Sequence, residues 1–180
     1  MSPTETRYGV VVADPPWSYN NSGTRGAAAN HYPTMPDREI EAIHVPSAED
    51  SVLFLWATWP KLPEGLSVLR AWGFEYVTGL PWIKLVGDPS INLWGELTIK
   101  PQYGVGFWVR GCSEPLLIGR RGSVSPPGGG FVGLLSENLR HSRKPENVYH
   151  IAERLPGPYL EMFARRKRLG WDSWGNEVKP

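Results

Sequence analysis

Short apolar runs alternate along this chain with segments of helical spacing, and this alternation limits the possible folds more than any other feature. Runs rich in β-branched and aromatic residues predict strands over 10–13, 51–58, 75–85, 113–122 and 159–166. Apolar residues at helical spacing predict helices over 34–43, 65–74 and 144–157. Strands that alternate with helices favour an α/β fold, in which a mostly parallel sheet carries helices on both faces.

Start and stop signals accompany these segments. Thr34 is the expected N-cap of the first helix, where Asp37 completes a capping box, and Gly73 is expected to end the second. The polar stretch 19–31 is long enough for a functional loop. The Gly-, Pro- and Ser-rich stretches 86–104 and 122–141 are expected to be long loops, and the strand over 159–166 is expected to be the last.

Length and composition exclude several classes of protein. With 180 residues, 41% of them apolar and 21% charged, the chain suits a single domain over 1–180 and is not expected to be disordered. The longest nearly apolar stretch, 52–59, is too short to span a bilayer. No apolar signal region opens the sequence, so we expect a cytoplasmic location. The lone Cys112 argues against internal disulfides and a cysteine-based zinc site, and we expect no metal.

Charge and aromatic content bear on the partner. A net charge of +1 provides no overall attraction for nucleic acid, although basic clusters occur at 120–121, 140–144 and 165–168. Such clusters are commonly solvated surface. The nine tryptophans exceed what a core of this size needs, so some of them could stack on a planar ligand such as a base or a sugar.

The segment Asp14-Pro15-Pro16-Trp17 follows the first predicted strand directly. Neither proline can donate a backbone hydrogen bond, so the sheet ladder must end there, at the edge where open α/β sheets bind ligands. The Asp14 carboxylate and the Pro15 carbonyl are two adjacent acceptors, which suit an exocyclic amine with its two hydrogens. Trp17 could then flank the base that bears this amine. The structural alternative is a Pro-Pro turn capped by Asp14.

Several motifs in this order resemble the DPPW-type adenine-N6 methyltransferases. This family includes the catalytic subunit of the eukaryotic messenger-RNA N6-methyladenosine writer and many bacterial and phage DNA enzymes. The motifs are ADPPW, HYPTMPDREI, FLWAT, PWIK, GVGFWVRGCSEPLLIGRRG, RKPENVYHIAERL and LEMFARRKRLGWDSWGNEV, and they cover the chain from about Tyr8 to Glu177. The resemblance implies a Rossmann-like fold, S-adenosylmethionine as the methyl donor, and a permuted order with the catalytic motif ahead of the main cofactor motif.

The resemblance also assigns roles to individual residues. Asp14 and Pro15, with Pro16 and Trp17, would form the catalytic motif, and Asp14 would also contact the donor. Tyr32 would face the other side of the substrate base, and Glu114 would lie near the substrate. The donor would be held by Arg121 at its carboxylate and by Phe163, Arg165, Asn176 and Glu177 at its ribose and adenine. For Phe163 a plain core position is the alternative.

These observations lead to one functional hypothesis and two alternatives. We expect methyl transfer to the N6 amine of adenine in nucleic acid, DNA rather than RNA, in the cytoplasm of a bacterium or a phage-infected cell. Because no separate nucleic-acid-binding domain is evident, loops, basic clusters, a second copy or a partner subunit would hold the substrate. The first alternative is a catalytically silent methyltransferase-like subunit that binds nucleic acid or a partner. The second is a Trp-rich carbohydrate-binding module.

Overall fold

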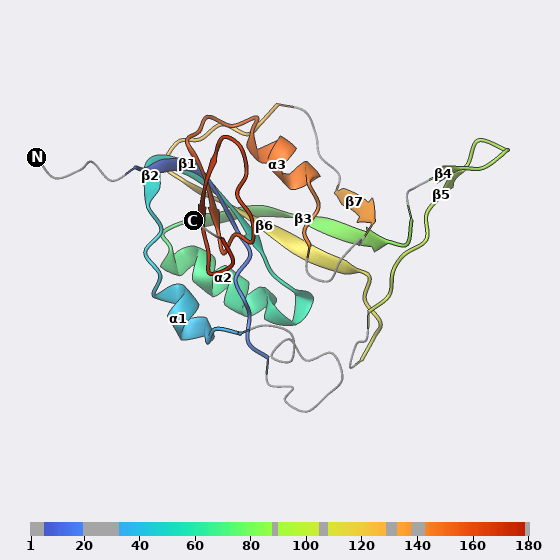
Figure 1. The fold of residues 1–180 in the computed structure, drawn as a ribbon, viewed down its shortest axis with the longest axis horizontal. Coiled ribbons are helices and arrows are strands. Elements are labelled where there is room, and N and C mark those ends of the chain that lie inside the picture. The colour runs from blue at the N-terminus through green and yellow to red at the C-terminus, as the bar shows by residue number, and fades with distance from the viewer. Residues whose placement is uncertain are drawn as a thin grey trace, which may run out of the picture.

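The fold is built on one central sheet, seen in a computed structural model that describes residues 6–19, 33–87, 90–104, 108–128, 133–137 and 143–178. Its seven strands follow the order β7-β3-β6-β2-β1-β8-β9 (Figure 1). They are β1 (Tyr8–Ala13), β2 (Ser47–Trp56), β3 (Glu75–Leu85), β6 (Ser113–Arg121), β7 (Leu134–Glu137), β8 (Tyr159–Met162) and β9 (Trp171–Trp174). Two further short strands, β4 (Ser90–Ile91) and β5 (Leu97–Thr98), pair only with each other.

Strand direction decides which residues meet. β1 pairs in parallel with β2 and β8, β8 with β9, and β3 with β7, whereas β6 runs antiparallel between β2 and β3. The carboxyl ends of β1, β2, β3, β8 and β9 therefore lie at one edge, together with the start of β6. We call this edge the carboxyl edge. Ligands bind outside this edge in open α/β sheets.

Helices cover both faces of the sheet. α1 (Asp37–Glu41), the 3₁₀ turn η2 (Trp59–Lys61) and α2 (Leu62–Ala71) belong to one side, and α3 (Asn147–Ala152) belongs to the other (Figure 1). Along β1, Val11 packs into the cluster of α1 and α2, and its neighbours Val10 and Val12 pack into the cluster of α3. Both faces of β1 are thus buried, as expected for a parallel strand. The predicted α/β class, with a mostly parallel sheet and helices on both faces, is confirmed.

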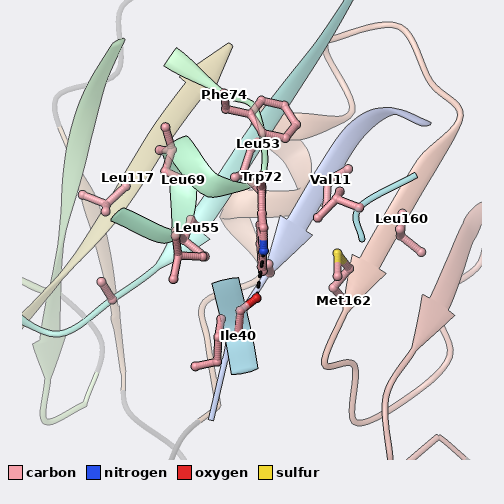
Figure 2. Packing of buried hydrophobic residues seen from close by; sticks show 14 of the residues in the cluster. Val11, Ile40, Leu53, Leu55, Leu69, Trp72, Phe74, Leu117, Leu160 and Met162 are labelled. Carbon is pink, nitrogen blue, oxygen red and sulfur yellow. Dashed lines mark hydrogen bonds between the residues drawn. The ribbon is translucent and has the colours of Figure 1, made fainter. Parts of the chain in front are cut away.

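The larger helical layer is fixed by one polar contact inside an apolar cluster. The indole N–H of Trp72 donates to the carbonyl oxygen of Ile40 at 2.9 Å, which joins α2 to α1 (Figure 2). Around this bond pack Leu53 and Leu55 of β2 and Leu69 of α2, all fully buried. The satisfied indole N–H makes the burial of Trp72 favourable, because an unpaired donor there would be costly.

The expected N-cap of the first helix is wrong. The helix begins at Asp37, and the residue at its cap is Pro36, which makes no side-chain cap hydrogen bond. The carbonyl of Pro36 accepts the N–H groups of Glu39 and Ile40 at 2.9 and 3.2 Å, so the first turn closes without Thr34. Pro36 itself has an extended ψ of 143°, so the helical backbone begins only at Asp37.

Apart from shifts of a few residues at other boundaries, the predicted strands and loops differ from the structure in three places. β8 ends at Met162, short of the expected end at residue 166, and β9 follows it as the last strand. The stretch 122–141, expected to be a loop, contains β7, and the stretch 86–104 contains β4 and β5. Of the loop expected over 19–31, only Tyr19 is among the described residues.

In the described part of the chain, no helix is both long enough and apolar enough to cross a membrane.

The β4–β5 pair forms an arm that projects from the body of the molecule (Figure 1). Leu93 and Trp94 lie between these two strands, and both side chains are exposed. The arm therefore lies outside the two clusters of buried core residues.

Candidate active site

The carboxyl edge brings together four side chains of alternating charge from four different segments. Asp14 directly follows β1, Lys144 precedes α3, Glu114 is the second residue of β6, and Lys84 is the penultimate residue of β3. Lys144 Nζ lies 2.9 Å from the carboxylate oxygens of Asp14 and 3.4 Å from Glu114 Oε2. Lys84 Nζ donates to Glu114 Oε1 at 2.5 Å. The result is a continuous row, Asp14–Lys144–Glu114–Lys84, which we call the charged row.

Two buried indole rings lie against the charged row. Lys144 Nζ is 5.4 Å from the ring centroid of Trp56, and Lys84 Nζ is 5.0 Å from that of Trp82. The rings of Trp56 and Trp82 meet edge to face at 5.7 Å. An ammonium group is attracted to the face of an indole ring, and the attraction grows when water is excluded. The rings therefore hold the two lysines at the edge.

Burial and pairing act in opposite directions on these charges. Burial disfavours the carboxylate of Glu114, but the ammonium groups of Lys144 and Lys84 outweigh this effect and hold its pKa below its ordinary value. Burial likewise disfavours the ammonium of Lys144, yet Asp14 and Glu114 raise its pKa above its ordinary value. Lys144 and Glu114 are therefore both charged at neutral pH, and each depends on the other.

The turn after β1 is held by its own backbone and by a buried tryptophan. The Pro15 carbonyl accepts the N–H of Trp17 at 2.9 Å, and the Pro16 carbonyl accepts the N–H of Met35 at 2.8 Å. A carbonyl oxygen has two lone pairs, so that of Pro15 keeps one for a ligand. Asp14 remains partly exposed at this turn.

Trp17, expected to flank a ligand base, is placed in the core by the structure, and its contact with a base stays a prediction. Its side chain is only 4% exposed, and its indole N–H donates to the Trp56 carbonyl at 3.1 Å. The ring belongs to the core cluster on the side of α1 and α2. Trp17 therefore anchors the turn, because its ring packs in the core and its N–H is bonded to β2.

The residues predicted to hold the donor's ribose and adenine come together at the ends of β8 and β9. Phe163 follows β8, is half-buried against the core, and meets Trp174 edge to face at 5.2 Å. Arg165 Nε lies 3.5 Å from Glu177 Oε1. The N–H of Ala164 donates to the Trp174 carbonyl at 2.9 Å and ties the two strand ends together. Asn176, which precedes Glu177, is exposed.

A glutamate connects this region to the charged row. Glu146 pairs with Arg166 and Arg168 of the β8–β9 loop and with Arg143, while Arg168 lies over the ring of Tyr149 at 3.4 Å. Burial alone would raise the pKa of Glu146. Its contacts with arginines, of which that with Arg168 has the largest effect, lower the pKa below its ordinary value. Because Glu146 is two residues from Lys144, the β8–β9 loop and the charged row are held in one arrangement.

Arg121 does not belong to this edge. It is the last residue of the antiparallel β6, pairs with Ser51 in the ladder, and donates through Nη1 to Ser47 Oγ at 3.0 Å. Ser47 is the first residue of β2, so Arg121 lies at the opposite edge of the sheet. The structure therefore does not bring Arg121 together with the other predicted donor-binding residues, and its contact with the donor's carboxylate stays a prediction. Tyr32, expected to face the substrate base, lies outside the described residues.

Sequence reasoning missed both lysines and the two indole rings. Lys84 lies in the motif PWIK, one residue before the end of a predicted strand, and a lysine near a strand end is a signal that could have been used. In the sequence, Lys144 belongs to a basic cluster over 140–144 of a kind that is commonly solvated surface. Its ammonium is instead mostly buried, with 14% of the side chain exposed. Its partner Asp14 is 130 residues away in sequence, so no local pattern connects the two.

Comparison with known proteins assigns this chain to a family. The MT-A70 family model matches residues 8–177. The type II methyltransferase M.MunI of a Mycoplasma species is 31% identical over 198 residues, which cover 96% of this chain and 78% of that protein. The METTL3 catalytic subunit of the human N(6)-adenosine-methyltransferase is 30% identical over 182 residues, and a Drosophila melanogaster MT-A70-like N(6)-adenosine-methyltransferase is 31% identical over 179 residues.

The alignments cover different fractions of the relatives' own lengths. The alignments to the human and Drosophila proteins cover 96% of this chain but only 28% and 27% of those proteins. The similarity nevertheless extends from the first strand to the end of the candidate donor site. The chain belongs to the MT-A70 family.

Proposed function

We propose that this chain transfers a methyl group from S-adenosylmethionine to the N6 amine of adenine in nucleic acid. The observation that carries the proposal is the pair of acceptors after β1, which are the Asp14 carboxylate, held by Lys144, and the neighbouring Pro15 carbonyl. Several relatives are named as N(6)-adenosine-methyltransferases, and one as a type II methyltransferase. Family membership also argues against a carbohydrate-binding module.

The two acceptors suit the chemistry of the amine. The lone pair of an adenine amine is delocalised into the ring, so the nitrogen is a poor nucleophile. Asp14 and Pro15 would each accept one N–H hydrogen and draw the nitrogen toward a tetrahedral shape. Lys144 holds the Asp14 carboxylate in position through contacts of 2.9 Å. The acceleration would come from this alignment and from hydrogen bonds that strengthen as charge develops on the nitrogen.

The residues at the ends of β8 and β9 fit the chemistry of the donor. S-adenosylmethionine, when bound, supplies a methyl group carried on a sulfonium. Glu177 and Asn176 present oxygens that can accept hydrogen bonds from ribose hydroxyls, and Arg165 can donate to acceptors of the ligand. Arg165 and Glu177 already lie 3.5 Å apart between their polar atoms. Phe163 offers a half-buried ring beside them.

We further propose DNA rather than RNA as the substrate. The DNA proposal follows the likeness to a bacterial type II methyltransferase, of which the alignment covers 78%, against 28% of human METTL3. An adenine within a duplex must leave the base stack before the amine reaches Asp14, at a cost of a few kcal/mol. A single strand avoids most of that cost.

The test is methyl transfer from labelled S-adenosylmethionine to single- and double-stranded DNA and RNA of one sequence, followed by nucleoside analysis. N6-methyladenine in DNA would support the whole proposal, and N6-methyladenine in RNA alone would overturn the DNA part. The matched control replaces every adenine by guanine. Donor binding without transfer to any oligonucleotide would instead support a catalytically silent subunit.

A further inference from the structure

The turn that follows β2 presents a tryptophan to solvent at the carboxyl edge. Trp59 opens the 3₁₀ turn η2, and its side chain is 50% exposed. Its indole N–H donates to the hydroxyl of Ser113 at 2.9 Å. Ser113 is the first residue of β6 and directly precedes Glu114 of the charged row. An exposed ring is thus tied by its polar end to the strand that carries part of the candidate site.

The backbone beneath this ring is fixed from several sides. The hydroxyl groups of Thr58 and Tyr19 are 2.7 Å apart, which ties the turn to the segment that follows Trp17. The N–H of Lys61 donates to the Thr58 carbonyl at 2.9 Å, and Lys61 Nζ contacts Asp37 at 2.7 Å. The turn therefore lies between the segment that follows Asp14 and the strand that carries Glu114.

The other exposed tryptophans lack this combination. Trp94 is 82% exposed on the projecting arm, and Trp108 is 98% exposed in the segment before β6. Trp174 is half-exposed and packs edge to face against Phe163 in the candidate donor site. Trp59 combines an accessible ring, a bonded N–H and a rigid turn. A ring that is already ordered loses little conformational entropy when a ligand stacks on it.

We propose that Trp59 stacks on the base adjacent to the methylated adenine. This inference rests on the proposed function and adds a substrate contact to it. When the adenine leaves its stack, the neighbouring base loses a partner on one face, and an exposed indole at the same edge can cover that face. The net charge of +1 provides little general attraction to the phosphate backbone, so stacking would supply a large part of the affinity.

The experiment is a double-substitution cycle on oligonucleotide binding. A labelled single-stranded DNA with one adenine, and versions with an abasic residue on either side of it, are titrated with wild type and Trp59→Ala in the presence of S-adenosylhomocysteine. We expect Trp59→Ala to weaken binding of the intact strand about 5- to 150-fold. An abasic residue on one side of the adenine should weaken the binding of wild type by a similar factor. Trp59→Ala should bind that abasic strand only a little more weakly than wild type does, because the stacking contact is lost in either case.

Two further variants separate stacking from folding. Trp59→Phe keeps an aromatic ring without the indole N–H and should retain most of the affinity. Trp94→Ala, the matched control on the arm, should bind like wild type. The inference would be overturned if the loss of affinity from Trp59→Ala added to the loss from an abasic residue on both sides of the adenine. An equal loss of affinity in Trp59→Phe and Trp59→Ala would also overturn it. So would a wild type that binds none of the strands.

Methyl transfer to the intact strand is measured in parallel, so that the two proposals can fail separately. Transfer with additive losses would overturn the role of Trp59 and leave the proposed function standing. Coupled losses, together with transfer to none of the single- and double-stranded DNA and RNA substrates of the first experiment, would overturn the proposed function and leave the stacking contact standing.

Discussion

Individual residues of the charged row depend on one another because each is largely removed from water. A buried charge is tolerated when an opposite charge or a hydrogen bond replaces its hydration, and removing one partner leaves the other unpaired. Here Lys144 is shared between Asp14 and Glu114, and Glu114 is shared between Lys144 and Lys84. Substitutions in the row should therefore affect both the chemistry and the stability of the edge.

Asp14→Asn should reduce methyl transfer about 100- to 1,000-fold while donor binding persists. The amide is close to the carboxylate in size but accepts through one oxygen and carries no charge to pair with Lys144. The measurements are single-turnover transfer to an oligonucleotide and calorimetric donor binding. Asp50→Asn is the matched control, because Asp50 lies at the opposite edge, where it accepts the N–H of Ser123. Full activity of Asp14→Asn would contradict the assignment.

Glu114→Gln should lower the free energy of unfolding by about 1–3 kcal/mol at about pH 7. The pKa of Glu114 is lowered in the folded state, so its contribution is fully present above the ordinary carboxyl pKa of 4.5 and is lost as the pH falls through the lower folded value. The difference between wild type and variant should therefore shrink below that pH. Urea unfolding at several pH values measures it, and a pH-independent difference would contradict this explanation.

At the scale of elements, the ends of β8 and β9 form a strained and closely packed junction. Phe163 has a φ of 60°, in the left-handed region that non-glycine residues rarely adopt. A Cβ added at Gly175 would lie 2.3 Å from the backbone oxygen of Ala164. Strained backbone of this kind persists only where the surroundings hold it, and it clusters at ligand sites.

Gly175→Ala should therefore destabilise the fold by about 1–3 kcal/mol and weaken donor binding. The added methyl group meets backbone atoms, which cannot rotate away, so the ends of β8 and β9 must separate. Thermal unfolding and donor titration provide the two measurements. Gly111→Ala is the control, because a Cβ there meets no atom within 4 Å. Unchanged donor affinity in Gly175→Ala would argue against a donor site at this junction.

The link between the β8–β9 loop and α3 depends on Glu146. Glu146→Gln should weaken donor binding and speed amide hydrogen exchange over 163–170, since a neutral amide cannot pair with the guanidinium groups of Arg166 and Arg168. Hydrogen exchange by mass spectrometry measures the loop directly. Glu39→Gln on the exposed side of α1 should leave exchange there unchanged. Equal exchange in wild type and Glu146→Gln would show that the contact does not order the loop.

At the scale of the whole molecule, buried and exposed apolar surface are separated. The two core clusters flank the sheet, whereas most of the exposed large apolar side chains that the structure describes lie between residues 86 and 109. These are Val86, Ile91, Leu93, Trp94, Leu97, Ile99, Tyr103, Trp108 and Val109. The arm therefore adds little to the core. That residues 1–180 form one domain stays a prediction.

Replacing both Leu93 and Trp94 by serine should change the free energy of unfolding by less than about 0.5 kcal/mol. The two side chains are 98% and 82% exposed, so their removal uncovers almost no buried surface. Trp82→Ala provides the contrast, since that ring is 1% exposed and its loss should cost about 3–5 kcal/mol. Urea unfolding compares both with wild type. A large loss in the serine variant would mean that the arm packs against the body.

Much of the fold could be read from the sequence because its signals are local. β-Branched runs such as 51–58, helical spacing in 65–74, and two prolines after Asp14 each act within a few residues. They were enough for the α/β class and for the position of Asp14 at the end of β1. β9 was not predicted, because its four residues, WDSW, contain no run of β-branched or other apolar residues.

The composition of the site was decided by tertiary structure, because strand direction and contacts between distant segments have no local signal. The antiparallel direction of β6 places Arg121 at the far edge and Glu114 at the site. Lys144 and Asp14 are 130 residues apart in sequence and meet only in the folded chain. Packing in the core buries Trp17, whereas Trp59 stays exposed. The sequence by itself determined which strand ends in the acceptor pair. Only the tertiary structure decided which charges and rings surround it, since electrostatic pairing and burial depend on neighbours in space.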